Sequence, residues 1–91
     1  MKDFTVGKEI RYVDGDYNDC INRWEIKRAA KRIFPKGTEM RKIKVTYLGR
    51  WDNGFDKYNI YKVVSAEGVT KYVGMNYNSY DGGFYYEMKE E

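Results

Sequence analysis

The stretch KYNIYKVVSAEGVTKYVGM, residues 57–75, decides the fold class of this chain. Two runs in which apolar and polar residues alternate, 57–65 and 69–75, flank the short turn AEG. Alternation with a period of two is typical of a half-buried strand, and a short turn containing glycine joins antiparallel neighbours. The stretch therefore predicts an antiparallel β-hairpin.

Strand-like segments continue on both sides of this hairpin. They are MRKIKVTYLG (40–49), WDNGFD (51–56), GFYYEM (83–88) and FTVGKEIRYV (4–13). Asn53-Gly54 in the second segment is a strong hairpin turn signal. The last segment alternates only in part, so it predicts an edge strand or two short strands.

The segment RWEIKRAAKRIF, residues 23–34, has helical spacing instead. Its apolar residues fall on one face and its basic residues mostly on the other. Residues 35–37, PKG, end the helix because proline and glycine do not continue it cheaply. We therefore predict an α+β fold, with one basic amphipathic helix (about residues 22–34) packed on a four- to five-stranded antiparallel β-sheet in the order β-α-β-β-β-β. The expected core is Ile26, Ala30, Ile33, Val45, Ile60, Val64 and Val73.

Length and composition limit the classes of protein. The 91 residues make a single domain, 1–91, and a hydrophobic content of 42% with one proline argues against disorder. No apolar run approaches the ~20 residues that span a bilayer, and the N-terminus lacks the apolar core of a signal peptide. Cys20 has no cysteine partner, which suits a reducing compartment. We expect an intracellular, cytoplasmic protein that does not bind membranes.

The segment DGDYNDCINRWE, residues 14–25, matches ligand positions of an EF-hand calcium loop. Position 6 of that loop is Asp19, where a glycine normally makes the sharp turn, and the residues before the loop are strand-like. Asn22 and Glu25 instead match a capping box, flanked by Ile21 and Ile26 as a hydrophobic staple. We predict a helix cap without metal, and keep a single EF-hand-like calcium-binding module as an alternative.

Residues 59–74, NIYKVVSAEGVTKYVG, resemble the opening hairpin of GIY-YIG endonucleases. The resemblance covers Ile60-Tyr61 and Tyr72-Val73-Gly74, with Asn59 in place of the family's first glycine. It implies that Tyr61 and Tyr72 take the roles of the family's two tyrosines at a metal-dependent hydrolytic site. The family's later helices, with their arginine and glutamate, have no counterpart in the seventeen residues after Gly74. We therefore do not extend the nuclease activity to this chain.

Other catalytic arrangements are missing from the sequence. The chain has no histidine, which excludes Ser-His and Cys-His pairs and histidine-bearing zinc sites, and no glycine pattern matches a phosphate loop. We predict a protein that is not an enzyme and needs no cofactor.

The charge is distributed unevenly along the chain. Residues 23–44 carry nine basic and two acidic residues, a net charge of +7, whereas the rest of the chain sums to −4. Like charges at this density repel one another, so a partner that neutralises them is expected. The predicted partner-binding residues are Arg23, Lys27, Arg28, Lys31, Arg32, Lys36, Arg41, Lys42, Lys44, Tyr61 and Tyr72.

The predicted function is binding of nucleic acid or of a nucleic-acid-handling protein. Phosphates would lie on the Lys/Arg-rich helix, which we expect to contain no ion pair of its own, and bases would stack on exposed tyrosines of the sheet. The alternative is a phage-type, anti-CRISPR-like inhibitor that blocks a host nuclease or defence complex by occluding its surface.

Overall fold

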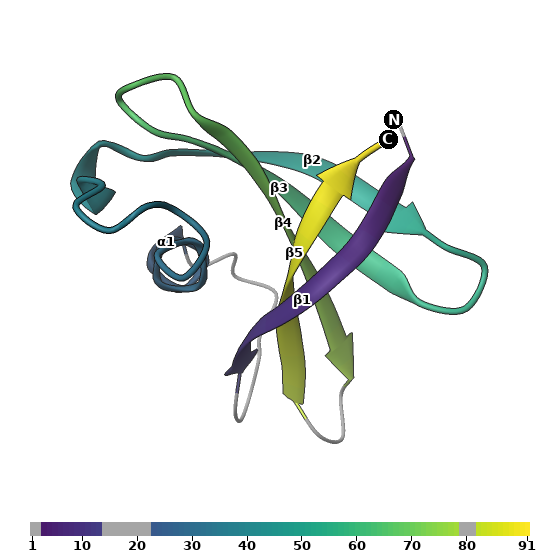
Figure 1. Ribbon diagram of the computed structural model, residues 1–91. Helices are drawn as coiled ribbons and strands as arrows, with labels where there is room; N and C mark the ends of the chain where they lie inside the picture. Colours follow the sequence, from purple (N-terminus) through teal and green to yellow (C-terminus); the bar gives the residue numbers. More distant parts are fainter. Residues whose placement is uncertain (1–2, 14–22, 79–81) are drawn as a thin grey trace.

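The computed structural model describes residues 3–13, 23–78 and 82–91, which form a five-stranded antiparallel sheet with one short α-helix (Figure 1). The strands are β1 (Phe4–Val13), β2 (Lys44–Asp52), β3 (Lys57–Val64), β4 (Thr70–Asn78) and β5 (Gly82–Glu90). The helical elements are α1 (Arg23–Ala30) and the single 3₁₀ turn η1 (Met40–Lys42). The antiparallel sheet predicted from the sequence is confirmed.

The strand order in the sheet is β1-β5-β4-β3-β2. Strands β2 to β5 follow one another as a meander, and β1 pairs with the outer side of β5. Residues 57–75 form the predicted hairpin, in which Val64 pairs with Thr70 across the turn. Its turn is closed by the Ser65 N–H, which donates to the Val69 carbonyl at 2.9 Å, while Gly68 adopts the left-handed φ of +85°. Strand β1 is an edge strand with two register shifts, as its partial alternation predicted.

The helix is shorter than the predicted range of 22–34. Strict α-helix ends at Ala30, and the N–H groups of Arg32 and Ile33 donate to carbonyls three residues back, at 3.1 and 2.9 Å. This tightening precedes Pro35, whose ring disfavours helical geometry in the residue before it. Residues 40–42, expected to begin a strand, form η1 instead, and β2 starts at Lys44.

One face of the sheet belongs to a first core that also contains residues of α1. Ile26 is 1% exposed, and Ala29 and Ala30 are 0% exposed. The buried members of this first core are Ile10, Ile26, Ala29, Ala30, Phe34, Ile43, Tyr61, Val63, Val73, Met75 and Tyr85.

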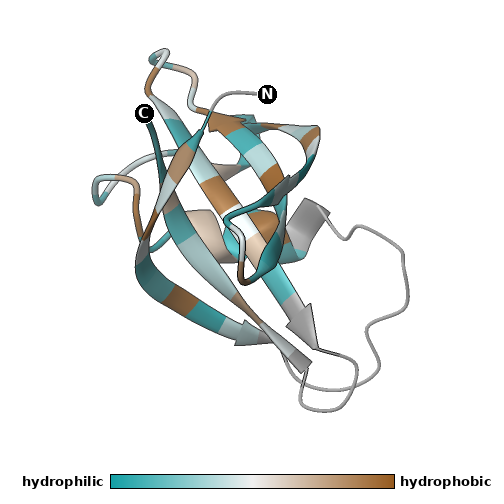
Figure 2. Ribbon diagram, turned by 90° about the vertical axis from the view of Figure 1, so that its right-hand side faces the viewer, coloured by the Kyte–Doolittle hydropathy of each residue, from teal (hydrophilic) through white to brown (hydrophobic). Residues whose placement is uncertain are grey.

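The other face holds a second core, made of Phe4, Tyr58, Ile60 and Met88, with Val6, Trp51, Tyr72 and Tyr86 packed against it. Alternate residues of a strand point to opposite faces, so Ile60 enters the second core and Tyr61 the first. Figure 2 shows the resulting alternation of apolar and polar residues along the strands. Phe4 of β1 reaches Trp51 of β2 with ring centroids 5.8 Å apart, so the two edge strands meet over this face and the sheet curls around the second core.

Gly74 makes room for the second core. A Cβ atom at this position would lie 2.7 Å from both Cγ and Sδ of Met88, closer than real contacts allow. Met88 therefore fills the space above the backbone of β4, where it is 2% exposed.

Four of the seven predicted core residues are buried. Ile26, Ala30, Ile60 and Val73 are at most 1% exposed. Ile33, Val45 and Val64 are partly exposed, so they contribute less to the core than the four buried residues. Ile33 and Val45 pack against the first core from its margin, where the last turn after α1 and the edge strand β2 leave one side open to water.

Candidate nucleic-acid interface

The predicted basic residues come from α1, the segment after it, η1 and the start of β2. Arg23 begins α1, but its side chain lies outside the described part of the structure. The remaining basic residues fall into three groups: those held by a hydrogen bond or an ion pair, the half-buried Lys27, and those that are exposed and form no ion pair within the described residues.

Arg28, Arg32 and Lys42 belong to the first group. The Arg28 Nη1 lies 3.4 Å from Oε1 of Glu25, whose Oε2 also lies 3.4 Å from the Arg11 Nε. The Arg32 Nη1 donates to the Ile10 carbonyl at 2.7 Å, which ties the end of the helical segment to β1. Lys42 pairs with Glu39 at 3.5 Å. The expectation that the helix contains no ion pair was therefore wrong, because Glu25 lies one turn before Arg28.

Lys27 is half-buried and lines a hollow of about 330 Å³ between α1 and the start of β2. The other lining residues are Ile43, Lys44, Val45 and Thr46. Two lysines at the mouth of one hollow favour an anionic group there.

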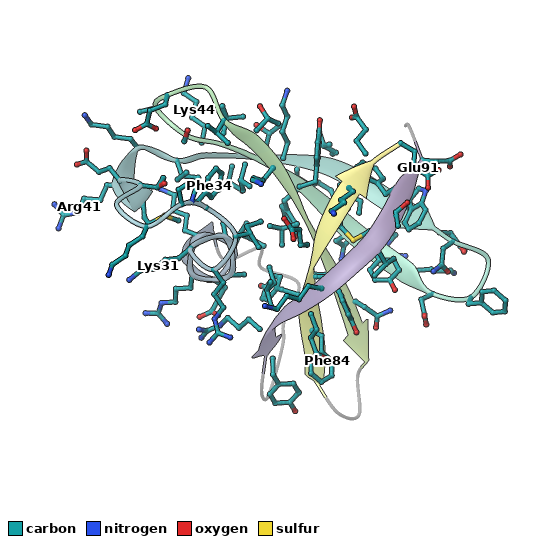
Figure 3. The ribbon with its side chains drawn as sticks, in the orientation of Figure 1. Lys31, Phe34, Arg41, Lys44, Phe84 and Glu91 are labelled. Carbon is teal, nitrogen blue, oxygen red and sulfur yellow. The ribbon has the colours of Figure 1, made fainter. Side chains whose placement is uncertain are left out.

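A group that we call the cationic end consists of Lys31, Lys36, Arg41 and Lys44. All four side chains are exposed, and within the described residues none of them forms an ion pair. Figure 3 shows Lys31 and Arg41 pointing outward on the side of the molecule that carries α1, far from Phe84. The fold thus keeps these charges together at one end and leaves them in solvent.

The two predicted tyrosines have different positions. Tyr61 is 1% exposed in the first core, so it is no part of an exposed surface, and its prediction as a partner-binding residue does not agree with its place in the fold. Tyr72 is half-buried and packs its ring edge-on against Phe4 at 5.4 Å. Successive residues along β3 and β4 point to opposite faces of the sheet. Both residues are tyrosines, so the residue type alone does not show which face each one occupies.

Tyr72 belongs to a continuous row of aromatic rings that the sequence analysis did not identify. Successive ring centroids lie 5.0 to 6.4 Å apart along the row Tyr72, Phe4, Trp51, Tyr58, Tyr86, Phe84 and Tyr12. The row contains residues from all five strands, which are distant in sequence, so no local pattern predicts it.

Carboxylates, rather than cations, lie near this aromatic row. Burial raises the pKa of Tyr58 above its ordinary value of 10.0, and the negative charge of Asp56 raises it further. Burial likewise raises the pKa of Tyr86, with Glu9 as the second cause. Burial raises the pKa of Tyr72, helped by a hydrogen bond to Glu90. Negative charges beside the rings repel phosphates, so the row is a poor platform for nucleic-acid bases.

Tyr47 is an exposed aromatic residue of β2, and it follows Thr46, which lines the hollow, in the sequence. Its side chain is 46% exposed, and its hydroxyl donates to the Asn59 Oδ1 at 2.9 Å. The ring also leans on Tyr61 with centroids 5.3 Å apart, which holds it in place. The alternation of Ile43, Val45 and Tyr47 places Tyr47 on the same face as two residues of the first core and its margin, so it gave no signal that this ring would be exposed.

The helix cap and the alternative calcium loop both depend on residues 14–22, which lie outside the described residues. Glu25, the described member of both patterns, pairs with Arg11 and Arg28. Over residues 3–13, 23–78 and 82–91, no three Cys, Asp or Glu side chains are grouped to hold a metal ion.

No protein-family model matches the chain, and neither the curated proteins nor the solved structures contain a significant match. Over the part of the chain that the structure describes, no helix has the length and apolar character needed to cross a membrane.

Proposed function

We propose that this chain is a binding protein without catalytic activity, and that its cationic end engages nucleic acid through the phosphate backbone. In this proposal α1 is a basic amphipathic helix packed on the sheet, and it holds the cationic end in a fixed arrangement. The observation that carries the proposal is the set of four exposed cations without an acidic partner in the described residues, Lys31, Lys36, Arg41 and Lys44.

Repulsion among these cations contributes nothing to folding, and their placement favours an anionic ligand. Of the acidic residues near them, Glu25 pairs with Arg28 and Glu39 with Lys42, and Glu67 lines a hollow together with Lys36 but forms no ion pair with it. A polyanion neutralises several of them at once and releases its own counterions, which is the main source of affinity in non-specific nucleic-acid binding.

The geometry favours contact with phosphates over reading of bases. The aromatic row lies beside carboxylates, whereas Tyr47 offers an exposed ring on β2, the strand that also carries Lys44. One ring can stack on one unpaired base, whereas sequence-specific recognition uses several base contacts. We therefore expect binding with little sequence preference.

The test is the affinity for labelled DNA and RNA at two salt concentrations. If each of the four cations meets one phosphate, affinity should fall by about 100-fold between 50 and 200 mM salt. In the Lys31→Gln, Arg41→Gln double variant two contacts are lost, and the same change of salt should cost only about 10-fold.

The matched control is the Lys8→Gln, Lys89→Gln double variant, which loses the same charge from exposed positions on β1 and β5. It should keep the salt slope of the unmodified chain. Equal losses in both double variants would show that only net charge matters, and the cationic end would then not be the site.

The inhibitor alternative gives a different result in the same assay. An acidic protein surface would also neutralise the cationic end, but labelled DNA and RNA would then fail to bind even at low salt. In that case the cationic end should retain one acidic protein from a host lysate, and the Lys31→Gln, Arg41→Gln variant should release it.

A further inference from the structure

Phe55 is the most exposed large apolar side chain that the structure describes. It is 95% exposed and lies in the loop of residues 53–56, which joins β2 to β3. Figure 1 shows this loop projecting from the end of the molecule opposite α1. A phenylalanine held so fully in water is unfavourable for an isolated chain, because burying an aromatic ring contributes strongly to binding.

The loop that carries Phe55 is held rigidly. The Asn53 Oδ1 accepts hydrogen bonds from the backbone N–H groups of Phe55 and Asp56, at 2.9 and 2.7 Å. The Asp52 Oδ1 accepts from the Gly54 N–H at 2.6 Å, and Gly54 takes a left-handed φ of +96°. The backbone under Phe55 is thus already ordered, which lowers the entropy lost when its ring docks in a pocket.

Two aspartates flank Phe55 and indicate the charge of its partner. Asp52 and Asp56 are both exposed at the tip of the hairpin, and the exposed Lys57, which lies opposite Asp52 in the strand register, offsets one of their two charges. Their charges repel phosphates and anionic lipid, so the tip does not suit nucleic acid or an anionic membrane. The surface that receives Phe55 should therefore be an apolar hollow near positive charge.

The same chain carries such a hollow at its other end. It has a volume of about 290 Å³ and lies between residues 35–38 and the turn 65–69. Pro35 and the 40% exposed Val69 give it apolar walls, and its two charged lining residues are Lys36 of the cationic end and Glu67. A cavity of about 150 Å³ accommodates benzene, so this hollow has room for a phenylalanine ring.

We propose that two copies of this chain associate head to tail, with Phe55 of one copy in the hollow formed by residues 35–38 and 65–69 of the next. Asp52 and Asp56 would then lie close to Lys36 of the receiving copy. Because the two surfaces differ and lie at opposite ends, the contact is heterologous, and repeating it gives open chains rather than a closed dimer. The contact is small, so its dissociation constant should be on the order of 100 μM.

The experiment uses two full-length variants that each keep one half of the contact. Phe55→Ala removes the tip and leaves the hollow, whereas Val69→Asp places a negative charge in the hollow and leaves the tip. Each variant alone should be monomeric by sedimentation velocity up to about 1 mM, where the unmodified chain should form species larger than dimers. An equimolar mixture of the two variants should form dimers only, because one intact tip meets one intact hollow.

Nuclear magnetic resonance locates the contact in the same mixture. When ¹⁵N-labelled Phe55→Ala protein is titrated with unlabelled Val69→Asp protein, amide shifts should appear at residues 35–38 and 65–69. The Phe55→Ala, Val69→Asp double variant is the matched titrant, and it should cause no shifts because it has no tip.

Glu67 offers a test in the opposite direction. It also lines the hollow, where its charge opposes that of the two aspartates. Glu67→Lys should therefore strengthen the association several-fold. The proposal is overturned if the unmodified chain stays monomeric at 1 mM, or if the shifts map to another surface. It is equally overturned if Phe55→Ala associates as the unmodified chain does.

Discussion

The two faces of the sheet are shielded by different means. On one face, α1 supplies Ile26, Ala29 and Ala30 to the first core. On the other face the sheet shields itself, because Phe4 of β1 reaches Trp51 of β2 and joins the two edge strands. The comparison shows that a sheet rich in tyrosine is not necessarily an open platform, since curling can bury aromatic rings that no helix covers.

The positive and negative charges of the molecule also lie on different surfaces. The cationic end lies on the side of α1, whereas Asp56, Glu9 and Glu90 lie close enough to the tyrosines of the second face to raise their pKa values. Phosphates and aromatic rings would therefore meet different surfaces of the protein. This arrangement does not agree with one continuous binding surface made of the basic helix and the whole tyrosine-rich sheet.

The largest expected effect is that of Phe4→Ala on the second face. Phe4 is 5% exposed and contacts both Trp51 and Tyr72, so its removal should lower the free energy of unfolding by about 3–5 kcal/mol. Urea denaturation followed by tryptophan fluorescence measures this change. Phe55→Ala is the matched control, because its 95% exposed ring should leave the free energy of unfolding within about 0.5 kcal/mol. Equal values for both variants would mean that the edge strands do not close over this face.

On the first face, Ile26→Ala should cost about 2–5 kcal/mol, because Ile26 is 1% exposed among the residues of the first core. Ile33 lies at the margin of that core and is half-buried, so Ile33→Ala should cost less, roughly 0.5–2 kcal/mol. The same urea titrations rank the two variants. A larger loss of unfolding free energy at Ile33 than at Ile26 would mean that Ile33, and not Ile26, is the more deeply buried residue of the first core.

Gly74→Ala probes how closely the second core packs on β4. The added Cβ would lie 2.7 Å from Met88 Cγ and Sδ, and the displacement of Met88 should cost about 1–3 kcal/mol. In a Met88→Ala background the obstacle is gone, so Gly74→Ala should cost clearly less there. Additive losses in this double-mutant cycle would contradict the contact between Gly74 and Met88.

The smallest expected effect is the loss of stability at alkaline pH that follows from ionisation of the tyrosines of the second face. Burial is the first cause of the raised pKa of Tyr58, Tyr72 and Tyr86, so the folded state holds their protons more tightly than the unfolded chain. The free energy of unfolding should thus be insensitive to these groups below pH 10 and decrease as the pH rises above about 10. Tyrosinate absorbance should show that three phenols ionise at a higher pH in the folded protein than in the protein unfolded in urea. Ionisation of all tyrosines at their ordinary pKa would contradict the burial of the row.

Local patterns in the sequence were enough to predict the antiparallel sheet and the presence of one helix, but not the 3₁₀ turn η1 or the end of α1 at Ala30. The alternation in residues 57–75, the Asn53-Gly54 turn and the apolar spacing around Ile26 depend on neighbours within one turn or one strand. The run of basic residues between 23 and 44 is likewise visible without coordinates, and four members of it form the cationic end.

The roles of individual side chains required the tertiary structure. Arg28 and Arg32 look like Lys31 in the sequence, yet one pairs with Glu25 and the other donates to the Ile10 carbonyl. Tyr61 and Tyr72 come from the same hairpin, but one is in the first core and the other in the aromatic row. These differences depend on which face each strand presents and on the curl that brings Phe4 to Trp51. Contacts between residues so distant in the chain follow from packing and leave no local pattern from which to predict them.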